Sequence, residues 1–105
     1  MRPRPAGAYM ANGYDLSRKA KDDLRGIWAY SEDRWGEQQA DVYYRDIFTT
    51  IERLVSGELK GRKADVRAGY LKYPVGRHFL YFTKVEGRIN IVRVLHQRME
   101  VTRHL

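Results

Sequence analysis

Two amphipathic helical patterns that follow one another almost without a break constrain this chain more than any other feature. Apolar or small residues recur at helical spacing over residues 20–35 and again over residues 40–55. Ser17 is a suitable N-cap for the first helix, and Gly36 and Gly57 are suitable C-terminal stops. Because about two residues join the helices, they must run antiparallel as a helical hairpin.

Short extended segments account for the rest of the folded chain. We expect a short strand at 14–16, a polar loop at 57–67, and three strand segments at 66–75, 78–84 and 89–97. The last segment is the most apolar, which predicts a central strand buried on both faces. The fold class is therefore α+β, in the order β-α-α-β-β-β, with the hairpin on one face of a small antiparallel sheet. Few elements remain for the other face, which we expect to be an exposed groove for a ligand or partner.

Length predicts a single domain over residues 14–105, preceded by a disordered leader or extension over residues 1–13, which is rich in Pro, Gly and Ala. The chain has no cysteine, which excludes disulfides, thiol nucleophiles and cysteine-based zinc sites. No apolar run approaches the ~20 residues that span a bilayer, and no signal peptide pattern follows the N-terminal arginines. We therefore expect a cytoplasmic protein with no membrane association.

Charge is distributed unevenly along the chain. Residues 1–59 hold nine Lys/Arg and ten Asp/Glu, whereas residues 60–105 hold eleven Lys/Arg and three Asp/Glu. Such a cationic second half favours a polyanionic partner, either nucleic acid or an acidic protein. A solvated basic surface without a partner is the alternative interpretation.

The last strand segment carries two notable polar residues, Arg93 and His96. Strict alternation places Arg93 on one face with Ile89, Ile91 and Leu95, and places His96 on the other, unless a bulge intervenes. A buried arginine needs a partner. We expect an internal ion pair with an acid of the first helix (Asp22, Asp23, Glu32 or Asp33), while binding of a partner or catalysis are the alternatives.

RNA cleavage is the sharpest enzymatic hypothesis. His96 could act as acid or base, arginines could hold a phosphate, and tyrosines of the strands could stack on a base. The strands supply no carboxylate base, so the set is incomplete. The spacing of the three histidines favours no metal site, no phosphate-binding loop is present, and no cofactor is expected. Trp28 and Trp35 lie on the apolar stripe of the first helix and are predicted to be core residues.

Several motifs together resemble the ParE toxins of the RelE/ParE superfamily of bacterial type II toxin–antitoxin systems. These motifs are the helix "DLRGIWAYSEDRWG", the segment "RAGY" before the sheet, and the C-terminal "RVLHQRMEVTRHL". The resemblance runs from about Tyr14 to Leu105. It implies the β-α-α-β-β-β architecture, a ParD-like antitoxin that binds and neutralises the toxin as a hetero-oligomer, and DNA gyrase as the target. RelE-like relatives instead cut mRNA on the ribosome, and the tail after His96 lacks the terminal tyrosine of those nucleases.

These observations favour a non-enzymatic toxin that blocks replication through gyrase. A ribosome-dependent mRNA endonuclease and a plain nucleic-acid-binding module remain as alternatives, and direct contact with nucleic acid is a secondary possibility. We assign no catalytic residue. The residues predicted from their positions to bind the target or the antitoxin are Arg67, Tyr70, Leu71, Tyr73, Arg77, Arg93, His96, Arg98, Met99 and Arg103.

Overall fold

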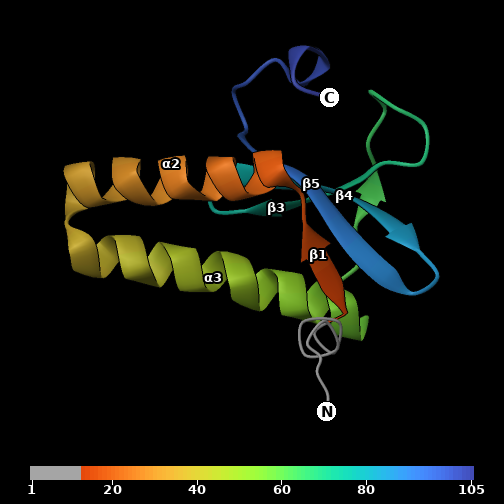
Figure 1. Cartoon of the computed structure of the whole chain (residues 1–105), viewed down its shortest axis with the longest axis horizontal. Coiled ribbons are helices and arrows are strands. Elements are labelled where there is room, and N and C mark those ends of the chain that lie inside the picture. Colours follow the sequence, from red (N-terminus) through yellow and green to blue (C-terminus); the bar gives the residue numbers. More distant parts are fainter. Residues whose placement is uncertain (1–12) are drawn as a thin grey trace.

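The helical hairpin is present as the sequence predicts. The computed structural model of the protein describes residues 13–105, and in it α2 spans Arg18–Trp35 and α3 spans Glu37–Ser56. Ser17 caps α2, because its side chain accepts a hydrogen bond from the Ala20 N–H at 2.9 Å. A single residue, Gly36, joins the helices with a φ of 93°, and the two helices lie side by side (Figure 1).

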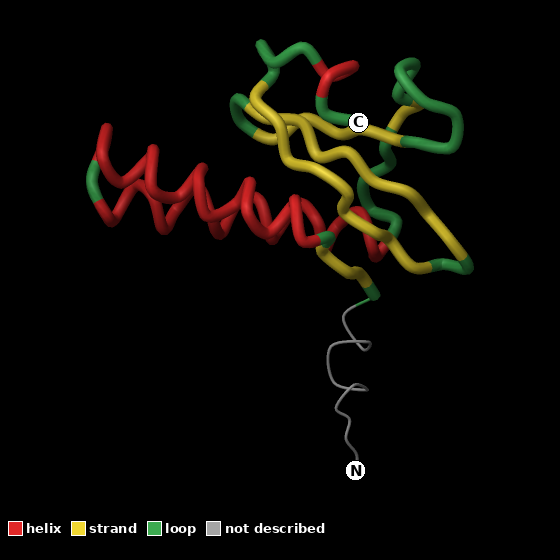
Figure 2. The backbone as a smooth tube through the Cα atoms, turned by 45° about the horizontal axis from the view of Figure 1, so that its top comes forward, coloured by secondary structure: helices red, strands yellow, loops and turns green. Residues whose placement is uncertain are grey.

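A five-stranded sheet packs against the hairpin. Its strands are β1 (Tyr14–Leu16), β2 (Arg62–Lys63), β3 (Leu71–Val75), β4 (His78–Val85) and β5 (Arg88–His96), followed by a 3-10 turn, η1 (Val101–Arg103). The order across the sheet is β1-β5-β4-β3-β2. The hairpin extends beyond the sheet at its closed end, while the C-terminal segment lies at the opposite side of the sheet (Figure 2). The α+β class is confirmed.

Three details of the sheet differ from the prediction. The sheet is mixed, because β1 pairs in parallel with β5 while the other neighbours pair antiparallel. Two residues of the expected loop form β2 on the edge beside β3. With β2 added, β4 takes the middle position, so β5 is an interior strand but not the central one.

A β-bulge in β5 corrects the predicted assignment of faces. Phe82 pairs with Ile91, but the preceding residue, Tyr81, pairs with Arg93, so Val92 is an extra residue in β5. The bulge reverses the alternation beyond it. Val94, and not Arg93 or Leu95, therefore shares the main core with Ile89 and Ile91.

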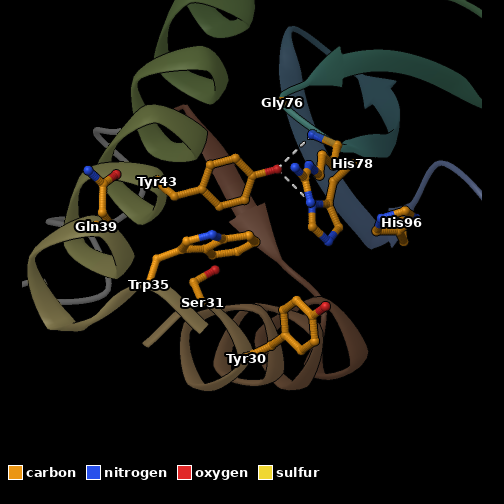
Figure 3. Close-up of a pocket in the computed structure, with 9 residues that line it drawn as sticks. Tyr30, Ser31, Trp35, Gln39, Tyr43, Gly76, His78 and His96 are labelled. Atoms are coloured by element: carbon orange, nitrogen blue, oxygen red, sulfur yellow. Dashed lines mark hydrogen bonds between the residues drawn. The ribbon is translucent and has the colours of Figure 1, made fainter. Parts of the chain in front are cut away.

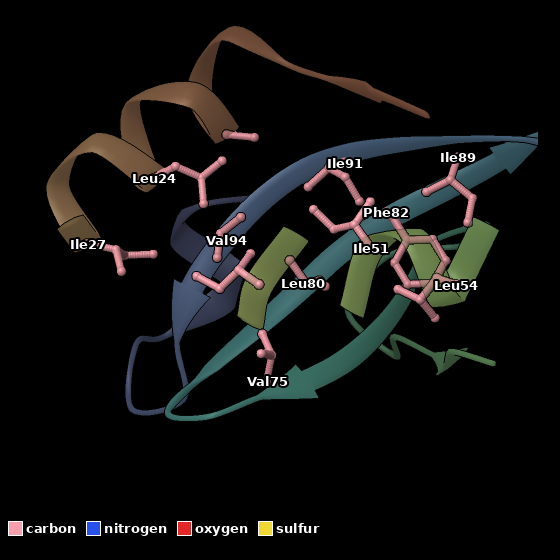
Figure 4. Packing of buried hydrophobic residues seen from close by; sticks show 12 residues of the cluster. Leu24, Ile27, Ile51, Leu54, Val75, Leu80, Phe82, Ile89, Ile91 and Val94 are labelled. Atoms are coloured by element: carbon pink, nitrogen blue, oxygen red, sulfur yellow. The ribbon is translucent and has the colours of Figure 1, made fainter. Parts of the chain in front are cut away.

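The main core lies between the hairpin and the sheet (Figure 4). Leu24 of α2 and Ile51 of α3 are buried against strand residues such as Leu80, Phe82 and Ile91. Each of these side chains is at most 2% exposed. Burial of this apolar surface is the main stabilising term for the fold.

The second face of the sheet is less open than the sequence analysis predicted. Tyr81 and Leu95 are buried there, and Tyr70, Phe79, Val101 and Leu105 pack around them. The C-terminal turn and the loop before β3 therefore cover part of this face with a second, smaller core. In the part of the chain that the structure describes, no helix is long and apolar enough to cross a membrane.

Candidate functional site

A crevice opens between the outer part of the hairpin and the ends of the strands that face it. Two adjoining cavities form it, with volumes of about 300 and 520 Å³. Tyr30, Arg77 and His96 line both cavities. The inner cavity adds Ser31, Trp35, Gln39, Tyr43, Gly76 and His78, and the outer one adds Arg34, Gln97 and Arg98. We call this site the arginine–aromatic crevice.

Tyr43 of α3 holds the turn between β3 and β4 against the hairpin. Its hydroxyl oxygen accepts a hydrogen bond from the Arg77 N–H at 2.9 Å and lies 3.1 Å from the Val75 carbonyl oxygen and 2.7 Å from Nδ1 of His78. Burial raises the pKa of the phenol, so it stays protonated at neutral pH. One side chain thus holds the backbone of Arg77 and the ring of His78 in place, and Figure 3 shows the Tyr43 hydroxyl directed at His78.

Two histidines meet in the crevice. His78 begins β4, His96 ends β5, and the two are direct partners in the register with ring centroids 5.3 Å apart. Burial, followed by the charge of His96, lowers the pKa of His78 to about 4, although the Asp23 carboxylate acts in the opposite direction. His78 is therefore neutral at physiological pH. Nδ1 of His96 accepts the Arg98 N–H at 3.1 Å, which directs Nε2 and its hydrogen away from that bond.

Arginines and aromatic rings form the walls of the crevice. The guanidinium carbon of Arg77 lies 5.3 Å from the Trp35 ring centroid, and that of Arg34 lies 5.4 Å from the Tyr30 ring centroid. Tyr30 and Trp35 contact each other edge to face with centroids 6.1 Å apart. Stacking on a ring restricts a guanidinium while its N–H groups still face solvent. Figure 3 shows the three rings of Tyr30, Trp35 and Tyr43 together with the two histidines.

The prediction that Trp35 is a core residue was wrong. Its side chain is 49% exposed because it lies at the C-terminal end of α2, where the hairpin extends past the sheet. Trp28 is half-buried, and its indole N–H donates to Asp41 of α3 at 3.0 Å. An amphipathic stripe therefore fills the core only over the length that the sheet covers.

Arg93 forms the internal ion pair that we expected. Its Nε and Nη2 donate to the two carboxylate oxygens of Asp23, both at 2.8 Å, and each side chain is 14% exposed. Asp23 also accepts the Val94 N–H at 2.9 Å, and Nη1 of Arg93 donates to the His104 carbonyl at 3.1 Å. The pair thus joins α2, β5 and the C-terminal turn. The hydrogen bonds to Asp23 raise the pKa of Arg93 further above its usual value.

The other predicted binding residues lie in separate places. Arg67 is exposed and stacks on Tyr70 beside the second core, whereas Leu71 and Tyr73 are half-buried against the main core. Met99 is 48% exposed just beyond β5. Arg103 is exposed on η1. Arg77, His96 and Arg98 come together in the crevice, whereas Arg67, Tyr70 and Leu71 line a separate cavity of about 500 Å³.

The sequence analysis missed most of the crevice. In a regular hairpin that turns at Gly87, His78 of β4 would pair with Leu95 of β5. The extra residue in β5, Val92, shifts the register by one, so that His78 pairs with His96 instead. The exposed position of Trp35 depends on how far the sheet extends along the hairpin. The one local signal was the cluster of Arg77 with His78 in a turn, beside the polar "HQR" at the end of the last strand.

The arrangement is suited to holding an anionic group against aromatic walls. Arginine N–H groups bind phosphate and carboxylate oxygens in a bidentate manner, and flat rings stack on planar ligands. No group of three or more His, Asp or Glu side chains that could hold a metal ion exists among residues 13–105.

Known proteins with the same fold come from toxin–antitoxin systems. A family model described as "ParE toxin of type II toxin-antitoxin system, parDE" matches residues 14–101. The Toxin ParE1 of Caulobacter vibrioides is 44% identical over 93 residues, covering 88% of this chain and 96% of that protein. The Toxin ParE1 of Mycobacterium tuberculosis strain H37Rv is 43% identical over 98 residues, covering 91% of this chain and 100% of that protein.

Solved structures agree at the level of the fold. A chain of the chromosomal ParDE system from P. aeruginosa superposes with a TM-score of 0.70 at 22% identity, covering 80% of this chain and 94% of that one. A chain of the YoeB-YefM complex from Staphylococcus aureus reaches a TM-score of 0.53 at 17% identity, with the same coverage. The protein is thus a toxin of a type II toxin–antitoxin system. Within that class it belongs to the ParE family.

Proposed function

We propose that this toxin inhibits DNA gyrase and that a ParD-like antitoxin neutralises it. The observation that carries the proposal is the extent of the family match, which begins at β1 and reaches η1. The whole described fold, and not one motif, is therefore of the ParE type, and inhibition of gyrase is the activity that this resemblance implies.

The charge of the chain supports a complex with an acidic antitoxin. Arg67, Arg77, Arg98 and Arg103 are exposed, and all lie in the cationic second half of the sequence. An acidic, partly disordered partner would gain charge-assisted hydrogen bonds to these residues as it orders on the surface. Tyr70, Leu71 and Tyr73 would offer apolar contacts at the same time.

A supercoiling assay with purified gyrase tests the activity. Antitoxin-free toxin would be added to gyrase, relaxed plasmid and ATP, and the products would be denatured with detergent and protease before electrophoresis. We expect loss of supercoiling together with linearised DNA from trapped cleavage complexes. The same reaction with a ParD-like antitoxin present should recover supercoiling. Unaffected gyrase, with toxin that is folded and inhibits growth of cells, would contradict the proposal.

One observation favours a second candidate function, ribosome-dependent cleavage of mRNA. His78, His96 and Tyr43 lie together beside Arg77, so two imidazole rings and a phenol lie next to a guanidinium that could hold a phosphate. General acid–base cleavage of RNA needs groups of these kinds. Toxin-dependent cuts in ribosome-bound mRNA, lost in a folded His96→Gln variant while gyrase is unaffected, would favour this alternative.

A further inference from the structure

The outer cavity of the arginine–aromatic crevice carries a concentrated positive charge. Arg34, Arg77 and Arg98 line it, and no Asp or Glu lines either cavity among the described residues. None of these arginines takes part in an ion pair within residues 13–105. By contrast, Arg93 is fully engaged with Asp23 nearby. The crevice therefore holds three cations that no carboxylate of the described residues neutralises.

The inner cavity has a different character. Its walls are the rings of Tyr30, Trp35 and Tyr43, with the neutral ring of His78 at its end. Besides Arg77, which lines both cavities, its polar groups are Ser31, Gln39, the two imidazoles and the tyrosine hydroxyls. At about 300 Å³ it falls at the lower end of the range for small-molecule sites. An uncharged planar group of a ligand could fill it and contact aromatic surface on several sides.

Together the two cavities match a molecule with a flat uncharged part and an anionic part a few bonds away. We propose that the arginine–aromatic crevice is a nucleotide-binding site. The base lies in the inner cavity against Trp35 and Tyr43, and the phosphates lie in the outer cavity on Arg77 and Arg98, with Arg34 at the rim. This ligand is additional to the gyrase and antitoxin proposed above, and it shares Arg77 and Arg98 with the proposed antitoxin contacts.

The shape and the donors favour a nucleotide over an acidic peptide. A helical peptide needs a groove that receives anchors at successive turns, whereas the inner cavity, at about 300 Å³, has the size for one small group. A guanidinium group can bind either a phosphate or a carboxylate in a bidentate manner. Three guanidinium groups around one opening, however, suit a ligand group that carries two or more negative charges. His96 adds an Nε2–H donor that both cavities share.

Isothermal titration calorimetry of the full chain with AMP and with ATP tests the site. The expected result is saturable binding of one nucleotide per chain, tighter for ATP than for AMP. The double variant Arg77→Ala/Arg98→Ala should weaken ATP binding by at least about tenfold, because it removes both charge-assisted phosphate contacts. Trp35→Ala should weaken AMP and ATP by a similar factor. The matched control, Arg62→Ala/Lys63→Ala, removes the same charge from exposed β2 and should bind as the wild type does.

Further measurements make the result decisive. Circular dichroism melting verifies that each variant is folded, and Arg77→Lys is a milder substitution that keeps the charge and loses the fork. Pyrophosphate that binds as tightly as ATP would overturn the proposal, because the inner cavity would then contribute nothing. Equal weakening by the β2 control, no binding at all, or displacement of ATP by a short polyglutamate at equal concentration would also overturn it. The gyrase assay on the same variants reports separately on the proposed toxic activity.

Discussion

Asp23 illustrates how one side chain of a helix can complete a strand. Beyond Ile91, β5 has a strand only on its β4 side, because β1 ends at Leu16, which is the partner of Ile91. Asp23 accepts the Val94 N–H there, and Ser17 donates its hydroxyl to the Val92 carbonyl at 2.7 Å. Asp23 of α2 and Ser17, the N-cap of that helix, therefore satisfy the free edge of β5 where the bulge lies.

The ion pair between Asp23 and Arg93 should be costly to break. We expect Asp23→Ala to lower the free energy of unfolding by about 3–5 kcal/mol, because it leaves a largely buried arginine without its partner. Asp22→Ala is the matched control, since Asp22 pairs with Arg25 at the exposed surface of the same helix. That change should cost no more than about 0.5 kcal/mol. Urea unfolding of both variants checks the prediction, and similar losses for the two would contradict it.

His78 should make stability depend on pH in a defined window. Its pKa is about 4 in the folded chain, mainly through burial, against an ordinary value of 6.5. Between these pH values the unfolded chain binds a proton that the folded chain does not. The free energy of unfolding therefore falls as the pH falls from 6.5 to about 4, and above pH 6.5 His78 causes no loss of stability. His78→Gln should flatten this dependence in unfolding titrations at several pH values. An unchanged slope in that variant, with His104→Gln as control, would assign the dependence to other groups.

At the scale of elements, the turn between β3 and β4 depends on a residue without a side chain. Gly76 has a φ of 54°, and a Cβ there would collide with the Tyr43 ring and lie 2.6 Å from its hydroxyl oxygen. Gly87, in the turn between β4 and β5, has a φ of 79° but open space around it. A side chain at Gly87 would therefore meet only the energetic cost of a left-handed backbone, whereas one at Gly76 would also meet the steric cost of contact with Tyr43 of α3.

Alanine substitutions at the two turns should therefore differ. Gly87→Ala should cost about 1 kcal/mol, the ordinary penalty for a left-handed conformation. Gly76→Ala should cost about 2–4 kcal/mol, because it adds a steric clash to that penalty. Chemical unfolding gives both values, and the near-ultraviolet circular dichroism of Gly76→Ala should also change as Tyr43 moves. Equal losses of stability in the two variants would mean that the Tyr43 side chain moves aside at no energetic cost.

For the whole molecule, the basic C-terminal segment is the feature to test for toxicity. Arg98 lies at the crevice and Arg103 is exposed on η1, while Val101 and Leu105 anchor the segment to the second core. Reversing both charges should reduce growth inhibition strongly without unfolding the protein, since neither arginine is buried. Arg98→Glu/Arg103→Glu would be compared in cells with Arg18→Glu/Lys19→Glu, which changes the same charge on exposed α2 residues. Full toxicity of the folded C-terminal variant would exclude this segment from the mechanism.

Local chemistry allowed the sequence alone to determine the hairpin and most of the strands. The helices are marked by local features: helical periodicity, the Ser17 cap, and the glycines at 36 and 57. Each of these depends only on residues close together in the sequence, so each can be recognised before the fold is known. A buried guanidinium requires a carboxylate partner. The sequence therefore limited the partner of Arg93 to the four acidic residues considered on the first helix.

Only the tertiary structure decided what the crevice contains. The bulge at Val92 sets which residue of β5 meets His78, and the extent of the sheet leaves Trp35 exposed. The parallel pairing of β1 with β5 likewise joins segments more than seventy residues apart. These features depend on the register of the strands and on the relative size of the helical layer and the sheet. Many residues determine both together as the chain packs, so no short stretch of sequence predicts them.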